Sequence, residues 1–175
     1  MKLRFDLNIN CHRRGLLLCP REDETWEHAA MRLCGIVFFW SYAPVAEAPM
    51  DMPAMENMAL RADLVGFDST GEITLWAECG ETDAGRMSKL VKRVPSTARL
   101  ALLAGSHAEG KKFRQQLDKK VRNSGRVEVL AWQEHEFLRW VAAMKEDNFI
   151  VGEADGRSLN LVFNDIPFAV DLKPF

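Results

Sequence analysis

Apolar and polar residues alternate over residues 2–9. A period of two predicts a half-buried strand. The polar stretch 10–15 is typical of a turn, and the apolar run 15–19 ends at Pro20. These three segments predict an opening β-hairpin.

Other segments have apolar residues every three or four positions, which is the period of a helix. The first helix begins at Asp23 or Glu24, and Asp23 would be its N-cap. Its apolar stripe is wide, which predicts a well-buried helix that ends before Pro44. Further helices are predicted over residues 83–93, 109–121 and 133–145.

Strands are predicted between these helices. Residues 62–67 and 72–79 form a second hairpin around the turn residues 68–71. Further strands are predicted over 99–104, 126–132, 148–152, 158–163 and 168–172. The middle of the chain alternates strand and helix, while both ends are hairpins. This order predicts one α/β domain over residues 1–175, with a mixed central sheet flanked by helices.

Residues 44–61 differ from the rest of the chain. They carry three prolines and four methionines and fit no element of ordinary length beyond a single helical turn. Loops of this length are often functional or mobile. The segment is either a methionine-padded connection over the core, or a lid or partner-binding loop.

Composition excludes several classes of protein. The chain has 175 residues, 47% of them hydrophobic and 27% charged. No apolar run approaches the roughly 20 residues of a membrane span. The first residues show no export signal, and the four cysteines form no Cys-x-x-Cys pair. We therefore expect reduced thiols, no membrane association and a cytoplasmic location.

The formal net charge is only −2, which disfavours a globally basic nucleic-acid binder. Positive charge nevertheless concentrates between residues 111 and 126. The candidate contacts to DNA or RNA phosphates there are Lys111, Lys112, Lys119, Lys120 and Arg122. The alternative is the solvated face of an ordinary helix.

Familiar catalytic motifs are absent from the sequence, and the four histidines are scattered. Two acids in the second hairpin stand out, because Asp63 opens one strand and Glu78 lies inside an otherwise apolar one. A buried carboxylate needs a partner or a metal. If Phe67 lies opposite Glu72, Asp63 and Glu78 share a face of the sheet; a turn of three residues would separate them unless a bulge corrects the register. On one face they could hold Mg²⁺ or Mn²⁺, and the alternative is ordinary ion pairing.

Three stretches resemble the bacterial YaeQ family, whose fold is that of the PD-(D/E)xK, or restriction-endonuclease-like, nuclease superfamily. The stretches are Glu24-Thr25-Trp26-Glu27, the second hairpin with Asp63 and with Trp76-Ala77-Glu78-Cys79-Gly80, and the helix with Asp83, Arg86 and Lys89. The resemblance implies an αβββαβ core with extra hairpins at both ends. It also implies a metal-dependent nuclease that hydrolyses phosphodiester bonds.

The same resemblance assigns roles to single residues. Asp63 and Glu78 match the metal-binding acids, assisted by the backbone carbonyl of Cys79, and Glu27, or else Glu24, matches the acid of the first helix. The superfamily's lysine falls at position 80, where this chain has Gly80. The resemblance assigns its role to Lys89, which would have to reach back from the next helix.

Gly80 leaves three functions open. The first is a Mg²⁺- or Mn²⁺-dependent nuclease, and the second is a nuclease-like protein without activity that binds nucleic acid or the transcription and repair machinery. The third is a protein–protein module that works through residues 44–61.

Overall fold

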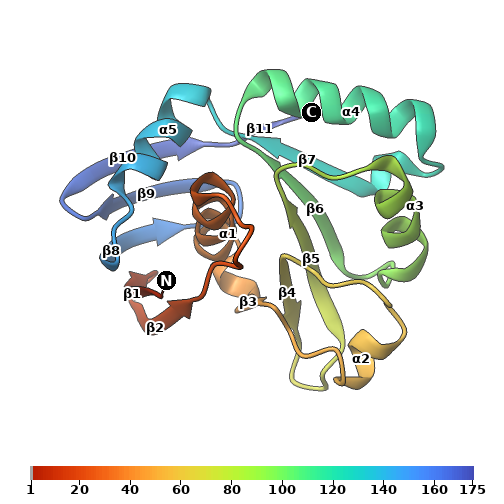
Figure 1. Cartoon of the computed structure of the whole chain (residues 1–175), viewed down its shortest axis with the longest axis horizontal. Coiled ribbons are helices and arrows are strands. Elements are labelled where there is room, and N and C mark those ends of the chain that lie inside the picture. Colours follow the sequence, from red (N-terminus) through yellow and green to blue (C-terminus); the bar gives the residue numbers. More distant parts are fainter. Residues whose placement is uncertain (1) are drawn as a thin grey trace.

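A computed structural model describes residues 2–175, which form one α/β domain with two β-sheets and five α-helices (Figure 1). Helix α1 lies between the two sheets. The helices are α1 (Trp26–Phe38), α2 (Pro53–Glu56), α3 (Ala84–Arg93), α4 (His107–Lys120) and α5 (Glu134–Ala143).

The first sheet has the strand order β10-β9-β8-β1-β2, and the second has the order β11-β7-β6-β5-β4-β3. The strands of the first sheet are β1 (Leu3–Ile9), β2 (His12–Leu18), β8 (Asp147–Ala154), β9 (Ser158–Phe163) and β10 (Ile166–Asp171). Those of the second are β3 (Val45–Ala46), β4 (Leu64–Phe67), β5 (Ile73–Cys79), β6 (Arg99–Ala104), β7 (Val127–Ala131) and β11 (Lys173–Pro174).

The predicted α/β class is confirmed, but the structure has two sheets where a single central sheet was predicted. The two hairpins at the ends of the chain join, because β1 pairs in parallel with β8 and Leu7 lies opposite Ile150. Such a pairing depends on residues far apart in sequence, which local hydrophobic periodicity does not report.

Helix α1 begins at Trp26, two or three residues after the predicted start at Asp23 or Glu24. Thr25, rather than Asp23, is the N-cap, and its hydroxyl accepts a hydrogen bond from the His28 backbone N–H at 3.1 Å. The helix ends at Phe38, before a 3-10 turn over Trp40–Tyr42. Residues from both sheets cover α1, which accounts for its wide apolar stripe.

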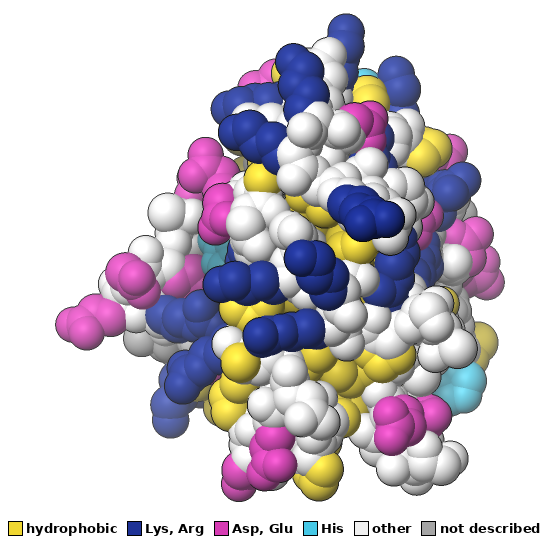
Figure 2. Space-filling model, turned by 90° about the vertical axis from the view of Figure 1, so that its right-hand side faces the viewer, with side chains coloured by type: hydrophobic (Ala, Val, Ile, Leu, Met, Phe, Trp, Pro, Cys, Tyr) yellow, Lys and Arg dark blue, Asp and Glu magenta, His cyan; other side chains and the backbone are white. Residues whose placement is uncertain are grey.

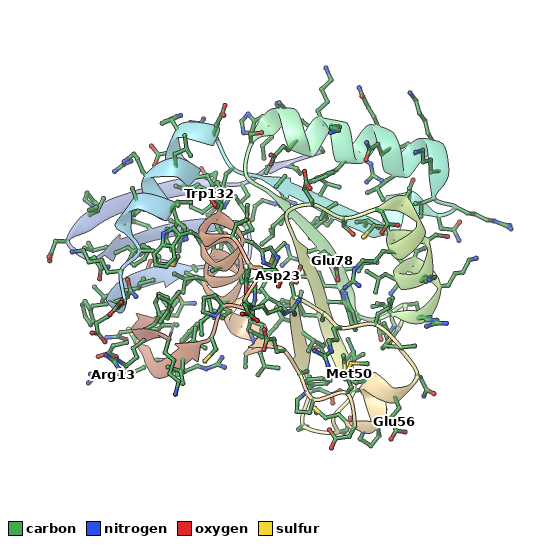
Figure 3. The ribbon with its side chains drawn as sticks, in the orientation of Figure 1. Arg13, Asp23, Met50, Glu56, Glu78 and Trp132 are labelled. Carbon is green, nitrogen blue, oxygen red and sulfur yellow. The ribbon has the colours of Figure 1, made fainter. Side chains whose placement is uncertain are left out.

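Two hydrophobic cores flank the second sheet. The first fills the space around α1 and α5 and is built on aromatic rings: the Trp140 ring centre lies 5.6 Å from that of Trp132 and 4.7 Å from that of Phe163. Trp132 lies near α1 and α5 (Figure 3). The second core joins the opposite face of the sheet to α3 and α4 and contains Trp76 and Phe113.

Residues 44–61 hold the predicted single helical turn, which is α2, and also the short strand β3. Met55 and Met58 are buried in the second core. This packing agrees with a methionine-padded connection, while a protein partner for the segment stays a prediction.

None of the helices within residues 2–175 is long and apolar enough to cross a membrane.

Gly35 allows α1 to approach the second sheet closely. A Cβ at Gly35 would lie 2.4 Å from Leu64 Cδ1 and 3.1 Å from Leu103 Cδ1. We expect Gly35→Ala to lower the free energy of unfolding by about 1–3 kcal/mol, because the added methyl group forces a packed core apart. Urea denaturation measures the change, with Gly15→Ala as control, since nothing lies within 4 Å of a Cβ at Gly15. Equal effects of the two substitutions would contradict this account of the helix–sheet contact.

Candidate functional site

The candidate site lies where β4 begins and β5 ends, and its register differs from the prediction. Phe67 lies opposite Ile73, not Glu72, and a bulge between Gly66 and Phe67 shifts the remaining pairs so that Leu64 lies opposite Ala77. A bulge is therefore present, but the shared face predicted for the two side chains is not, because Asp63 contacts His28 of α1 and Glu78 contacts Arg86 of α3. The bulge brings Asp63, just before β4, next to Glu78.

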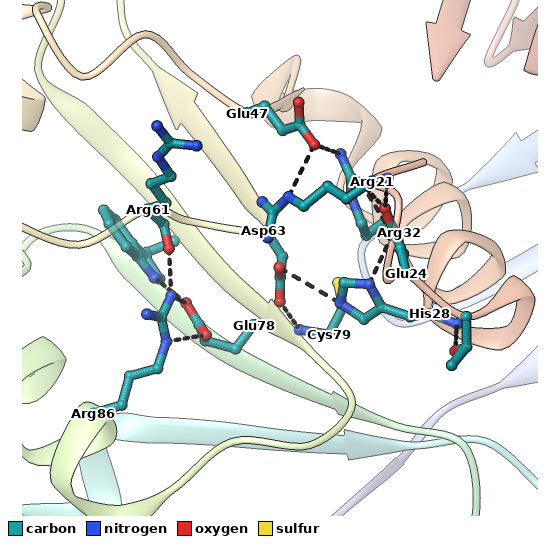
Figure 4. Close-up of polar contacts among 12 residues, drawn as sticks. Arg21, Glu24, His28, Arg32, Glu47, Arg61, Asp63, Glu78, Cys79 and Arg86 are labelled. Carbon is teal, nitrogen blue, oxygen red and sulfur yellow. Dashed lines mark hydrogen bonds and ion pairs between the residues drawn. The ribbon is translucent and has the colours of Figure 1, made fainter. Parts of the chain in front are cut away.

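Asp63 is held from two directions. Its Oδ2 accepts a hydrogen bond from the Cys79 backbone N–H at 2.9 Å, and its Oδ1 lies 3.5 Å from His28 Nε2 of α1. Burial opposes ionisation of Asp63, but the His28 ring and the Cys79 N–H outweigh it, and its pKa is lowered. Asp63 is thus an ionised carboxylate directed toward α1 (Figure 4).

Glu78 turns toward α3 and is nearly inaccessible to solvent, as the sequence pattern led us to expect. Its carboxylate accepts hydrogen bonds from Trp76 Nε1 at 2.7 Å and from Arg86 at 2.6 Å (Nε) and 2.9 Å (Nη2). The Arg86 guanidinium also donates to the backbone carbonyl of Arg61. Burial raises the pKa of Glu78 despite Arg86, and the nearby negative charge of Asp63 raises it further.

The two carboxylates are therefore neighbours whose partners lie on opposite faces of the sheet. Trp76, two residues before Glu78, belongs to the core beneath α3, while His28 extends from α1 on the other face. Among residues 2–175, no group of three or more His, Cys, Asp or Glu side chains is arranged to hold a metal ion. The donor set does not fit Mg²⁺ or Mn²⁺, because Arg86 and His28 already occupy the oxygens that a cation would need.

Glu24, the less favoured of the two predicted acids, lies just before α1 and contacts the site through His28 and Arg32. Its side chain is 2% exposed, and its oxygens contact His28 Nδ1 at 2.7 Å and Arg32 Nη1 at 2.8 Å. Glu27 is exposed and, like His28, lines a cavity at the start of α1.

Arg32 and His28 complete a polar network that the sequence analysis missed. The Arg32 side chain is 1% exposed and also contacts Glu47 at 3.3 Å, so it links α1 to the segment 44–61. Burial opposes ionisation of Glu24, yet the Arg21 backbone N–H and the Arg32 guanidinium lower its pKa. One signal was available in the sequence: Glu24, His28 and Arg32 are spaced by four residues, which would place them on one face of the predicted helix.

Neither position considered for the superfamily's lysine, 80 or 89, places a lysine side chain in the site. Gly80 follows β5 with a φ of +81°, a conformation that favours glycine. Lys89 is exposed, and its ammonium has no ion-pair or hydrogen-bond partner in residues 2–175. The cation that reaches Glu78 is Arg86, one turn earlier on α3.

The basic residues between positions 111 and 126 fall into two groups, one that stabilises the fold and one that is exposed. Arg114 and Arg126 donate to backbone carbonyls, including that of Val127 at 3.0 Å, and so have a structural role. The five predicted phosphate contacts are all exposed: Lys111, Lys112, Lys119, Lys120 and Arg122. The side of the molecule with α3 and one end of α4 faces the viewer in Figure 2, where Lys and Arg side chains gather and acidic ones lie mainly toward the edges. We name as the α3–α4 basic face the residues Lys89, Lys92, Arg93, Lys112, Lys119, Lys120 and Arg122.

No protein-family model matches the chain, and no curated protein sequence matches it. Two solved structures share its fold. The YaeQ protein from Xanthomonas axonopodis pv. citri is 14% identical and aligns with a TM-score of 0.75 over 99% of this chain and 96% of that chain. The YaeQ protein from Pseudomonas syringae is 15% identical, with a TM-score of 0.74 over 99% of this chain and 94% of that chain.

These likenesses confirm the predicted YaeQ-like fold over nearly the whole chain. At such identities they establish the fold alone. Membership of the wider PD-(D/E)xK superfamily, and with it any enzymatic activity, stays a prediction.

The position of His28 between Asp63 and Glu24 makes the stability of the fold depend on pH. The Asp63 carboxylate, with support from Glu24, raises the His28 pKa above its ordinary value of 6.5. The stabilisation is therefore fully present below 6.5 and is lost as pH rises through the raised pKa.

We expect His28→Gln to destabilise the protein by roughly 1.5–3 kcal/mol at about pH 5.5, because a charge-assisted contact is lost, and by less at about pH 9. Urea unfolding at the two pH values measures the difference, with His135→Gln as control because that side chain is 69% exposed. A cost of His28→Gln that is the same at both pH values would contradict the proposed charge on the ring.

Proposed function

We propose that this protein is a nuclease-like protein without hydrolytic activity that binds the phosphate backbone of DNA or RNA through the α3–α4 basic face. The observation that carries the proposal is the Arg86–Glu78 pair. Arg86 lies where a catalytic cation would approach Glu78, and it leaves no carboxylate oxygen of that residue without a donor. Because Arg86 already neutralises the Glu78 carboxylate, the site favours binding of nucleic acid over hydrolysis of its phosphodiester bonds.

The distribution of charge supports phosphate binding in particular. The chain as a whole is slightly acidic, yet the exposed side chains of α3 and of the end of α4 are largely basic (Figure 2). The two helices pack against each other, so their side chains form one surface. Backbone phosphates attract such a surface without any need for base readout, and salt weakens the attraction.

The competing function is a metal-dependent nuclease with Asp63 and Glu78 as ligands, the Cys79 carbonyl beside them, Glu27 as the supporting acid and Lys89 as the catalytic cation. This function would follow from membership of the PD-(D/E)xK superfamily. We disfavour it because Glu27 and Lys89 are both exposed and neither contacts Asp63 or Glu78. Cleavage of labelled DNA and RNA in Mg²⁺ or Mn²⁺ that disappears in Glu78→Gln would establish the nuclease and overturn our proposal.

We expect Lys119→Gln combined with Lys120→Gln to weaken binding to a labelled duplex about tenfold at 0.1 M salt and to lower the salt slope by about two, because two phosphate contacts are lost. Fluorescence anisotropy over a salt series measures both quantities. The control variant is Lys2→Gln combined with Lys145→Gln, which removes the same charge from exposed positions at the first sheet. Equal weakening by the two variants would show that net charge alone acts, and would contradict a binding face on α3 and α4.

A further inference from the structure

A cavity at one end of the second sheet has no part in the nucleic-acid binding proposed above. It has a volume of about 450 Å³ and lies beyond the carboxyl ends of β5 and β6, next to the start of α1. Its size is in the range of small-molecule sites, roughly 300–1,000 Å³. The residues that line it include Glu27, Met31, Gly80, Gly105 and Phe137.

The chain topology places a crevice here. Strands β6 and β7 are parallel neighbours, but α4 follows β6 onto one face of the sheet and α5 follows β7 onto the other. Phe113 of α4 lies in the second core, whereas Trp140 of α5 lies in the first. Where consecutive connections leave toward opposite faces, α/β proteins bind ligands between them.

One wall of the cavity is apolar and partly open to solvent. Met31 and Phe137 line it from α1 and α5, and Leu138 is 57% exposed beside them. An exposed leucine at the mouth of a concave site would lose its contact with water when a ligand with an apolar body enters.

The polar lining is acidic and contains no Lys or Arg among residues 2–175. Its four carboxylates are Glu27, Glu81, Glu109 and Glu134. The N-termini of three helices point toward these carboxylates, and each is equivalent to roughly half a positive charge. A protonated His28 would add one further positive charge. The negative charge of the four carboxylates therefore exceeds the positive charge around them by about one and a half elementary charges, and the cavity favours a cation.

All four acids are exposed and none has an ion-pair partner in residues 2–175, and the side chains of Glu27, Glu81 and Glu134 accept no hydrogen bond there either. Glu109 differs, because it accepts a hydrogen bond from the Gly105 backbone N–H at 2.9 Å. The three free carboxylates surround the apolar wall, and a ligand there meets negative charge and hydrocarbon together.

We propose that this cavity binds a small organic cation: a primary ammonium group on an apolar body, with the ammonium near Glu81 and Glu134 and the body against Met31, Phe137 and Leu138. The inference goes beyond nucleic-acid binding and does not depend on it. The cavity carries acids, whereas the α3–α4 basic face carries the opposite charge.

Tryptamine is the probe, because it joins an ammonium to an aromatic body, and indole-3-propionate is its matched anion. We expect tryptamine to shift the backbone amide signals of Gly80 and Gly105 saturably in ¹H–¹⁵N NMR spectra, and indole-3-propionate to leave them unchanged. Glu81→Gln combined with Glu134→Gln should weaken tryptamine binding roughly five- to tenfold, from the loss of two partly exposed ion pairs. Glu56→Gln combined with Glu146→Gln, a change of the same charge at exposed positions elsewhere, should have no effect.

Three results would overturn the proposal. Equal shifts from both probes would mean that only the apolar wall binds. No shift at Gly80 and Gly105 would mean that there is no site. Saturation of the same signals by a lysine-rich peptide, with tryptamine inactive, would mean that the cavity recognises a protein segment and not a small molecule.

Discussion

Carboxylates that are removed from water must receive positive charge or N–H groups from the protein, and this constraint shapes the centre of the molecule. A buried acid without a partner costs several kcal/mol, so each acid here determines the place of a base. Glu24 is matched by Arg32, Asp63 by His28 and Glu78 by Arg86. Since His28 extends from α1 and Arg86 from α3, the second and third of these pairs join both helices to the start of β4 and the end of β5.

The same pairs determine what the site can do. Both oxygens of Glu78 already accept hydrogen bonds from an arginine and an indole, and a metal ion there would have to compete with the Arg86 guanidinium, so the arrangement opposes a metal-dependent reaction at Glu78. The two binding functions that we propose therefore lie on surfaces that the network leaves exposed. Helix α4 contributes to two of them, because its first turn carries Glu109 and its last turn carries Lys119 and Lys120. This order also suits the helix dipole.

The sequence was informative where the physics is local. The apolar stripe of α1 predicted a buried helix, and a carboxylate in an apolar strand pointed to Glu78. It failed where residues distant in the chain decide the outcome. The parallel pairing of β1 with β8 made a second sheet, and the bulge at Gly66 set which residue lies beside Glu78. Arg86 was noticed as part of a resemblance, but only the packing of α3 against the sheet shows that it, and not Lys89, reaches the acid.

The most direct test of the account uses the Trp76 indole N–H, which donates to Glu78 at 2.7 Å. A Mn²⁺ ion held by Asp63 and Glu78 would broaden this proton's NMR signal strongly, since paramagnetic relaxation falls steeply with distance. Our account predicts that an equimolar amount of Mn²⁺ leaves the signal unchanged in the wild-type protein. Selective broadening of the Trp76 signal that excess Mg²⁺ reverses would contradict it, because it would show that a divalent cation displaces Arg86 from the carboxylate.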